Sequence, residues 1–180
     1  GKERKVAVFD IDGTIFRSSL LIELVEALIA RGIFPEDAWK QYEQKQKLWL
    51  DRRGSYENYI EAVIEAFEAH LKGVPYADFA SIAEEVILEN KSRLYRYTRD
   101  LLRELKEKGY YLLAISHSPK TVVDRFCKPL GFNKTYGTVF ETGPTERFTG
   151  MLLDEHLIFN KGTILKRAVE KEGLTLKGSY

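Results

Sequence analysis

The chain has 180 residues, 44% of them hydrophobic, and its formal net charge is +1. A chain of this length and composition can form one globular core with an insertion. So small a net charge provides no field that would recruit nucleic acid or an anionic membrane. No apolar stretch is long enough to span a membrane, and the single cysteine, Cys127, excludes an internal disulfide and suits a reducing cytosol. We therefore expect a cytoplasmic protein with no nucleic-acid partner.

An apolar run near the start of the chain ends in two carboxylates. Residues 6–9 are β-branched, small or aromatic and predict a buried strand. Asp10 and Asp12 follow, and because residues two apart in an extended chain project to the same face, both can reach one reacting group. Gly13 lets the chain turn sharply, and Thr14 offers a hydroxyl and a backbone donor to an anion. One carboxylate can attack phosphorus while the other protonates the leaving oxygen, although Asp and Gly also favour an ordinary turn.

Residues 18–90 carry amphipathic helical patterns and no convincing strand. Breaks at Gly32, Gly54 and residues 73–75 divide the segment into four predicted helices, and Gly32 is expected to cap the first. The predicted apolar faces are Leu21, Leu24, Val25 and Leu28; Trp39, Tyr42, Trp49 and Leu50, in a helix opened by Pro35; Tyr59, Ile60, Val63, Ile64 and Phe67; and Phe79, Ile82, Ala83, Val86 and Ile87. Aromatic stripes of this kind are more often packing than ligand contacts.

The second of these helices carries a basic run. Its cations are Lys40, Lys45, Lys47, Arg52 and Arg53, and two acidic residues, Glu43 and Asp51, interrupt them. We interpret the run as a solvated helix face. Attraction of an anionic substrate is the alternative.

A second apolar strand, running from Tyr110 to Ser116, ends in a hydroxyl. A helix is expected to begin directly afterwards, at Pro119 or Lys120, and a helix amino end that follows a strand is a ready anion site. Ser116 is therefore a candidate phosphate ligand, with turn or cap roles for Ser116 and Ser118 as the alternative. We interpret His117 as a solvated or substrate-contacting loop residue rather than a general base.

The remaining segments are a helix, a hairpin and a last helix. Residues 99–108 predict a helix that leads into the second strand, and this alternation of strand, helix and strand indicates a parallel, doubly wound sheet. Residues 138–142 and 147–153 predict a hairpin around a four-residue turn. Asn160 is a candidate N-cap that places Lys161 in the first helical turn. A cation there opposes the helix macrodipole at a cost of a few tenths of a kcal/mol, which suggests a function, although a solvated lysine is the alternative.

The segment Val8 to Thr14 resembles the first motif of the haloacid dehalogenase-like (HAD) superfamily, and Ser116 and Lys161 resemble its second and third motifs. The pattern is most similar to the phosphoserine phosphatase-like branch, in which a helical cap is inserted between the first two motifs. This resemblance implies an α/β fold with a Rossmann-like core, a parallel sheet, an inserted all-helical cap and a β-hairpin. Residues 1–17 and 91–180 would form the core, and residues 18–90 the cap.

The resemblance also implies a chemistry. Most members of the superfamily are magnesium-dependent phosphatases that act through an aspartyl-phosphate, here on a small phosphorylated substrate. Asp10 would be the nucleophile and Asp12 the general acid and base, while Ser116 and Lys161 would hold the phosphate. The Asp10 carboxylate and the backbone carbonyl of Asp12 would bind Mg²⁺. Further candidate substrate- and phosphate-binding positions are Ile11, Gly13, Thr14 and His117.

The cap departs from the phosphoserine phosphatase pattern. In that branch a glutamate and an arginine grip the amino acid, and the corresponding positions here hold Ser19 and, approximately, Val63. Neither side chain can form an ion pair, so strict phosphoserine specificity is not expected. Glu23 or Glu26 would substitute for the glutamate in a different register, although the helical pattern more simply makes them solvated.

The sequence up to Tyr180 also lacks the acidic fourth motif that supplies a further magnesium ligand in the superfamily. We therefore expect a sheet that is incomplete at its C-terminal end, with residues 6–9 as an exposed apolar edge. A truncated chain or a homo-oligomer that covers this edge would account for the pattern. Three functions remain: a phosphatase, a phosphotransferase of the same chemistry, and a catalytically incompetent phosphate-binding domain.

Overall fold

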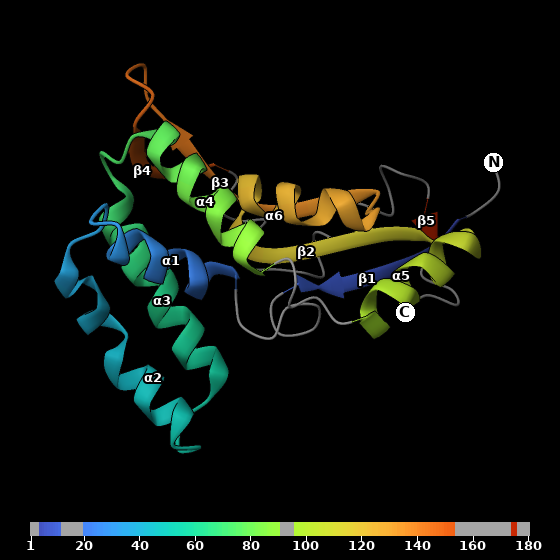
Figure 1. The fold of residues 1–180 in the computed structure, drawn as a ribbon, viewed down its shortest axis with the longest axis horizontal. Coiled ribbons are helices and arrows are strands. Elements are labelled where there is room, and N and C mark those ends of the chain that lie inside the picture. Colours follow the sequence, from blue (N-terminus) through green and yellow to red (C-terminus); the bar gives the residue numbers. More distant parts are fainter. Residues whose placement is uncertain (1–3, 12–19, 91–95, 154–173, 176–180) are drawn as a thin grey trace. The chain divides into compact units, whose positions relative to one another are not determined.

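The computed structural model describes residues 4–11, 20–90, 96–153 and 174–175 (Figure 1). The chain divides into two compact units. Unit 1 comprises residues 1–17, 87–139 and 152–180, and unit 2 comprises residues 18–86 and 140–151. Unit 2 thus takes in the tip of the hairpin, a segment that the sequence analysis assigned to the core. The functional division into a core of residues 1–17 and 91–180 and a cap of residues 18–90 stays a prediction.

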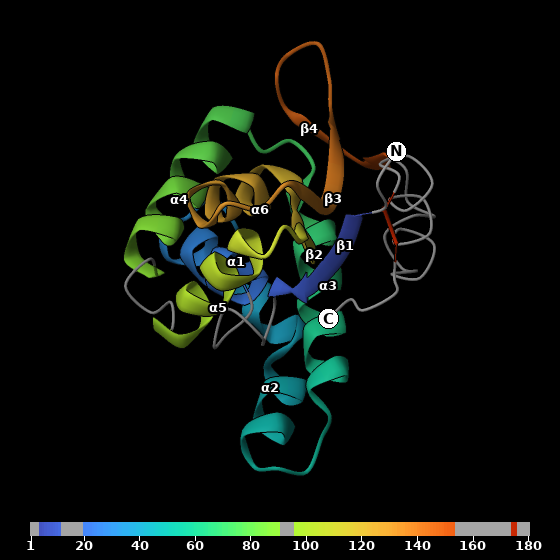
Figure 2. The ribbon, with the colours of Figure 1, turned by 90° about the vertical axis from the view of Figure 1, so that its right-hand side faces the viewer.

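Unit 1 is built on a sheet of parallel strands. Strands β1 (Arg4–Asp10), β2 (Tyr111–Pro119) and β3 (Lys134–Thr142) lie side by side in that order, with β2 in the middle. Helices α5 (Arg96–Glu107) and α6 (Lys120–Cys127) both contact β2 and lie on the same side of the strands (Figure 2). That placement is expected of two successive right-handed crossovers. The predicted parallel α/β sheet is confirmed.

Apolar residues explain why these strands are buried. Both faces of a parallel sheet are normally covered, so its strands are nearly continuous apolar runs. The buried cluster of unit 1 contains Val6, Tyr111, Leu113 and Ile115, with Val8 and Tyr136 packed against it. Helix α6 adds Val122, Val123, Phe126 and Cys127, all buried. The core therefore fixes the two strands, β1 and β2, whose ends carry the candidate site.

The expectation that residues 6–9 form an exposed apolar edge is wrong for the side chains of Val6 and Phe9, which are buried, whereas pairing on this side of β1 reaches only Arg4 and Lys5 among the described residues. A short strand, β5 (Leu174–Thr175), pairs in parallel with Arg4 and Lys5 of β1. Val6 is fully buried, and Phe9 is buried against the edge of the Phe132 ring, with ring centroids 5.8 Å apart. The Leu-Thr pair suits a strand because one residue is apolar and the other β-branched. A homo-oligomer that covers this edge remains a prediction.

Unit 2 is mainly helical, as predicted. Its helices are α1 (Leu20–Ala30), the 3₁₀ helix η2 (Glu36–Gln41), α2 (Glu43–Leu50), α3 (Tyr56–Leu71) and most of α4 (Tyr76–Asn90). Gly32 ends α1 in a left-handed conformation (φ 74°), and the backbone N–H of Ile33 donates to the carbonyl of Leu28. These features form a Schellman motif, which confirms the predicted cap.

The second predicted helix is two helices. Tyr42 leaves helical geometry (φ −123°, ψ −2°) between η2 and α2, and its buried ring packs against Tyr59 of α3. Turning this ring inward interrupts the helix. The prediction that the Trp39, Tyr42, Trp49 and Leu50 stripe packs inward holds for Tyr42 alone; the other three side chains are exposed.

A cluster of phenylalanines forms the core of unit 2. Phe67 of α3 is buried, and its ring centroid lies 5.9 Å from that of Phe34, 6.2 Å from that of Phe79 and 5.2 Å from that of Phe140. Phe79 also meets Phe148 edge to face at 5.2 Å. Phe140 and Phe148 come from the predicted hairpin, which is confirmed as the end of β3 and strand β4 (Phe148–Leu153). Across the described residues, no helix has the length and apolar character needed to cross a membrane.

Candidate active site

Asp10 is the last residue of β1. Its side chain is partly exposed, whereas Phe9 before it and Ile11 after it are buried. An apolar strand thus delivers one carboxylate to its carboxyl end, where ligands bind in open α/β sheets. Phe9 and Ile11 hold the backbone on either side, so the position of Asp10 is fixed by packing.

Ser116 lies beside this end of β1, on the neighbouring strand. Phe9 pairs with Ala114 and Asp10 pairs with Ile115, so Ser116 is one residue beyond the register partner of Asp10. Strand spacing and rise together place the Cα atoms of Asp10 and Ser116 about 6 Å apart. The structure therefore brings together two of the predicted site residues that are more than a hundred positions apart in the sequence.

The segment after Ser116 is held by a local hydrogen bond and a close backbone approach. Ser116 is buried, and its Oγ accepts a hydrogen bond from the backbone N–H of Ser118 (3.0 Å). A Cβ at Gly137 of β3 would lie 2.7 Å from Cα of Lys120, so only glycine lets β3 approach the start of α6 here. For Ser118 the sequence predicts only a turn or cap role. It is fully buried, and its Oγ has no hydrogen-bond partner among the described residues.

Other predicted site residues are less fully described. His117 belongs to β2, and only its backbone is described. Four predicted residues lie outside the described residues: Asp12, Gly13, Thr14 and Lys161. Their proposed roles stay predictions.

Comparison with known proteins places this arrangement in a family. A family model described as haloacid dehalogenase-like hydrolase matches residues 7–180. The chain belongs to the haloacid dehalogenase-like hydrolases. The match includes the described candidate residues Asp10, Ile11, Ser116 and His117.

This HAD hydrolase is also similar to individual proteins. It is 23% identical over 177 residues to a phosphoserine phosphatase of Archaeoglobus fulgidus, a match that covers 97% of this chain and 45% of that protein. The chain thus spans less than half the length of that relative. A solved structure of a phospho-aspartyl intermediate analogue of phosphoserine phosphatase matches with a TM-score of 0.61 at 21% identity, covering 99% of this chain and 77% of that one. A Bordetella pertussis protein of unknown function matches with a TM-score of 0.70 at 18% identity, covering 99% and 79%. At these identities the structures show a shared fold.

The donor chemistry of the HAD site suits magnesium. Mg²⁺ prefers oxygen ligands and uses one or two protein carboxylates, keeping several of its waters. Asp10 presents a partly exposed carboxylate at the strand end, which fits that preference. Among residues 4–11, 20–90, 96–153 and 174–175 there is no group of three or more His, Cys, Asp or Glu side chains that could hold a metal. Asp10 is a described carboxylate that could hold magnesium, and the carbonyl of Asp12 lies outside the described residues.

Val63 is fully buried in α3, so this position offers no charge to a substrate.

Two carboxylates of α1, Glu23 and Glu26, lie near the tyrosines Tyr42 and Tyr59 in unit 2. Partial desolvation and, after it, the neighbouring charge of Glu23 raise the pKa of Glu26, although the residue as a whole is exposed. Burial, followed by the charge of Glu26, raises the pKa of the Tyr42 phenol. Burial also raises the pKa of the Tyr59 phenol, and the charges of Glu26 and Glu23 act in the same direction.

Replacing Glu26 with Gln should stabilise the protein slightly at neutral pH. A carboxyl group whose pKa is raised on folding binds protons more tightly in the folded state, so stability falls as pH rises from the ordinary pKa of 4.5 through the raised value. Glu26→Gln removes that loss, and the gain is small because the residue is exposed overall. Thermal melts should show a higher Tm than wild type at pH 7 and an equal Tm below pH 4.5. A difference that persists unchanged at low pH would contradict this explanation.

Proposed function

We propose that this HAD hydrolase hydrolyses a small phosphomonoester through a phosphoryl group carried on Asp10. The observation that carries the proposal is the position of Asp10 and Ser116 at the carboxyl ends of paired parallel strands. Membership of the HAD family supports it. The phosphoserine phosphatases among the similar proteins act on a phosphomonoester, which favours the same class of substrate here.

The proposed reaction has two displacements. First, a carboxylate oxygen of Asp10 attacks phosphorus, the bond from phosphorus to the substrate oxygen breaks, and Asp12 gives its proton to the departing alcohol. Second, Asp12 takes a proton from a water molecule whose oxygen attacks the same phosphorus. The bond between phosphorus and Asp10 then breaks, inorganic phosphate leaves, and both aspartates return to their starting states.

The phosphate oxygens need donors that are in place before the reaction. Ser116 is buried, with its Oγ already fixed by the N–H of Ser118, and its hydroxyl hydrogen can be donated to a phosphate oxygen. Lys161 is the proposed cation at the same phosphate. Bound Mg²⁺, held by Asp10 and the carbonyl of Asp12, would offset the repulsion between carboxylate and phosphate.

The proposed substrate class is broader than phosphoserine. Val63 is buried and apolar, and the other divergent position, Ser19, lies outside the described residues. A small phosphorylated metabolite or head group therefore fits the cap better than a substrate gripped by a Glu and Arg pair. We propose the cytoplasm as the compartment, because the only cysteine, Cys127, is a buried free thiol.

The test is release of inorganic phosphate from a panel of phosphomonoesters that includes phosphoserine. The assay uses the purified 180-residue chain and its full natural gene product, with Mg²⁺ and with a chelator. We expect magnesium-dependent release from several small phosphomonoesters. Transfer of phosphate to an added alcohol in preference to water would indicate a phosphotransferase instead. Phosphate binding without turnover by the natural product would overturn the proposed hydrolysis.

Ser116→Ala should lower kcat/KM about a hundredfold, the usual cost of removing one donor to a developing oxyanion. The substitution also leaves the N–H of Ser118 without its partner, which should lower the free energy of unfolding by about 1–2 kcal/mol. The matched control is Ser81→Ala, at an exposed serine of α4, which should change neither quantity. Steady-state kinetics and urea denaturation measure the two effects. Unchanged kcat/KM in Ser116→Ala would remove this residue from the proposed site.

A further inference from the structure

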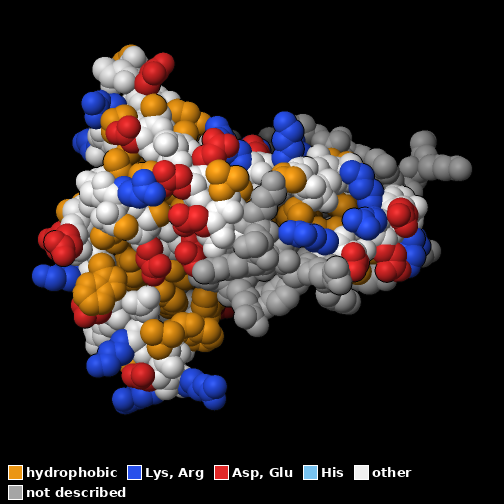
Figure 3. All heavy atoms as spheres, viewed as in Figure 1, with side chains coloured by type: hydrophobic (Ala, Val, Ile, Leu, Met, Phe, Trp, Pro, Cys, Tyr) orange, Lys and Arg blue, Asp and Glu red, His pale blue; other side chains and the backbone are white. Residues whose placement is uncertain are grey.

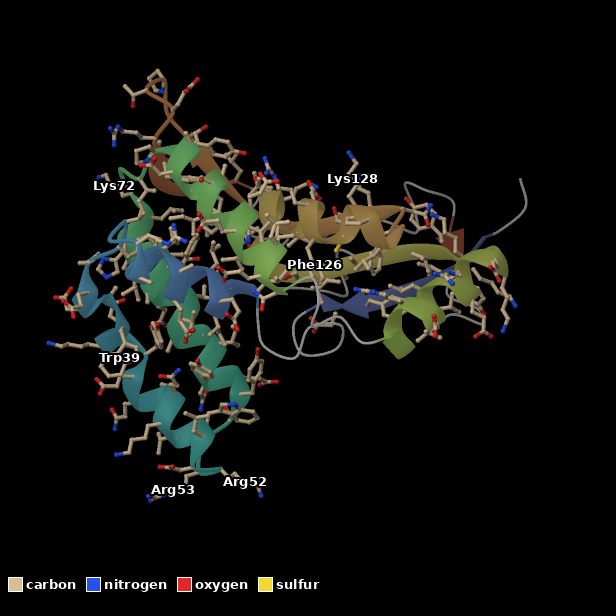
Figure 4. The ribbon with its side chains drawn as sticks, viewed as in Figure 1. Trp39, Arg52, Arg53, Lys72, Phe126 and Lys128 are labelled. Carbon is tan, nitrogen blue, oxygen red and sulfur yellow. The ribbon has the colours of Figure 1, made fainter. Side chains whose placement is uncertain are left out.

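The turn between α2 and α3 presents apolar side chains to solvent among cations. Leu50 is 71% exposed and Trp49 is 40% exposed, and α2 has no buried residue. We call this surface the basic tip; its residues are Lys45, Lys47, Trp49, Leu50, Arg52 and Arg53. Figure 3 shows basic side chains gathered with hydrophobic ones over the end of the α2 and α3 hairpin, and Figure 4 shows Arg52 and Arg53 pointing outward there.

The cations of the basic tip make no ion pair with another described residue. In the part of the chain that the structure describes, none of Lys45, Lys47, Arg52 and Arg53 has an ion-pair partner. Asp51 is the single carboxylate in the turn. Glu57, exposed in the first turn of α3, is a second carboxylate beside it, so four cations against two carboxylates leave the local charge positive although the whole chain is close to neutral. The basic run seen in the sequence is solvated, as expected, but it surrounds exposed apolar side chains rather than covering a plain helix face.

Arg52 has a left-handed backbone conformation, which is unusual for a residue other than glycine. The N–H of Arg52 donates to the carbonyl of Trp49, and the N–H of Arg53 donates to that of Leu48. This is the same Schellman motif that ends α1, where Gly32 occupies the left-handed position. After the end of α2 the left-handed position is held by Arg52 (φ 58°), a conformation that is sterically unfavourable for a residue with a Cβ atom. Arg52 thus occupies a position at which glycine would make the fold more stable.

We propose that the basic tip docks this protein, weakly and reversibly, on an anionic phospholipid surface. Tryptophan is suited to the boundary between lipid and water, and arginine and lysine can place their charged ends among anionic head groups while their stems cover apolar surface. An exposed leucine beside them can enter the acyl boundary. Clustered cations are attracted to anionic lipid over a Debye length, so the attraction is sensitive to salt. A few exposed side chains are too small a surface for a stable protein interface.

Tryptophan fluorescence can report binding of the basic tip to vesicles. It contains two tryptophans, Trp39 and Trp49, so Trp39→Phe leaves Trp49 as the sole fluorophore. On addition of phosphatidylcholine vesicles that contain phosphatidylserine, Trp49 emission should shift to the blue, and high salt should reverse the shift. Vesicles of phosphatidylcholine alone should give no shift. The reciprocal variant, Trp49→Phe, should show no shift from Trp39, which lies outside the basic tip (Figure 4).

Matched variants separate the basic tip from general charge. Arg52→Glu with Arg53→Glu should weaken vesicle binding at least tenfold in a sedimentation assay. Lys72→Glu with Lys128→Glu makes the same change in net charge at exposed cations elsewhere and should leave binding unchanged (Figure 4). Leu50→Ser should weaken binding, whereas Leu88→Ser, at a leucine that is 65% exposed on α4, should not.

Arg52→Gly distinguishes docking from a structural role. Glycine relieves the left-handed backbone, so this variant should unfold at a higher temperature than wild type while binding anionic vesicles more weakly. A purely structural Arg52 would leave vesicle binding unaffected. Equal binding to neutral and anionic vesicles, or equal losses in the two charge-reversal pairs, would overturn the proposal. So would tight binding to duplex DNA without a shift in Trp49 emission, because the basic tip would then be a general anion surface.

Discussion

Asp10→Asn should reduce phosphate release by at least about a thousandfold. The amide is nearly the same size as the carboxylate but cannot form an acyl-phosphate, so the first displacement has no nucleophile. Asp10 lies at the end of β1 between buried neighbours, and its side chain is partly exposed. The substitution therefore removes a charge at the partly exposed carboxyl end of β1 without removing core packing. The Tm should change little.

The matched control for this substitution is Asp100→Asn. Asp100 is an exposed aspartate on α5, in the same unit of the protein as Asp10. The Asp100→Asn variant should retain full activity. Phosphate release at saturating substrate, corrected for the fraction folded, is the measurement. If Asp10→Asn kept more than about a tenth of wild-type activity, another group would have to be the nucleophile.

Phe67→Ala should lower the free energy of unfolding of unit 2 by about 3–5 kcal/mol. The Phe67 ring is buried and contacts the rings of Phe34, Phe79 and Phe140, so its removal leaves a cavity bounded by aromatic side chains. These rings come from different segments and cannot close the cavity by moving a single element. The loss is therefore expected to approach the upper part of that range.

Tryptophan fluorescence during urea denaturation can measure this loss, because Trp39 and Trp49 both lie in unit 2. Phe67→Leu keeps part of the apolar volume and should cost clearly less than Phe67→Ala. As a further control, Tyr76→Ala removes an exposed ring from the margin of the same cluster and should have a smaller effect. A loss below about 1 kcal/mol for Phe67→Ala would mean that the phenylalanine cluster does not support unit 2.

Local patterns in the sequence predict most of the described elements. Continuous apolar runs predict β1 and β2, and helical periodicity predicts α1, α3 and α4. The glycine at position 32 predicts the end of α1. Asp10 and Ser116 were identified because each follows an apolar strand, and parallel pairing then brings those two strand ends together. These features depend on interactions between near neighbours or on one simple topological rule.

Features set by long-range contacts were missed. Nothing in the pattern around Tyr42 marks a break, because the interruption depends on where the ring of Tyr59 lies in the fold. The pairing of β5 with Arg4 and Lys5 joins the two ends of the described chain and involves only two residues of β5, too few for a periodic signal. The burial of Ser118 and the left-handed conformation of Arg52 depend on packing and backbone geometry that residue type alone does not reveal.

The most direct test of the proposed chemistry is to trap the phosphoryl group on the protein. The chain is mixed with a substrate that it turns over in the presence of Mg²⁺, quenched rapidly in acid, and treated with borohydride, which reduces an aspartyl-phosphate. Peptide mass spectrometry then locates the reduced residue. The proposed mechanism predicts reduction at Asp10 that depends on substrate and is absent in Asp10→Asn. Turnover with no modification at Asp10, or with modification at another residue, would contradict it.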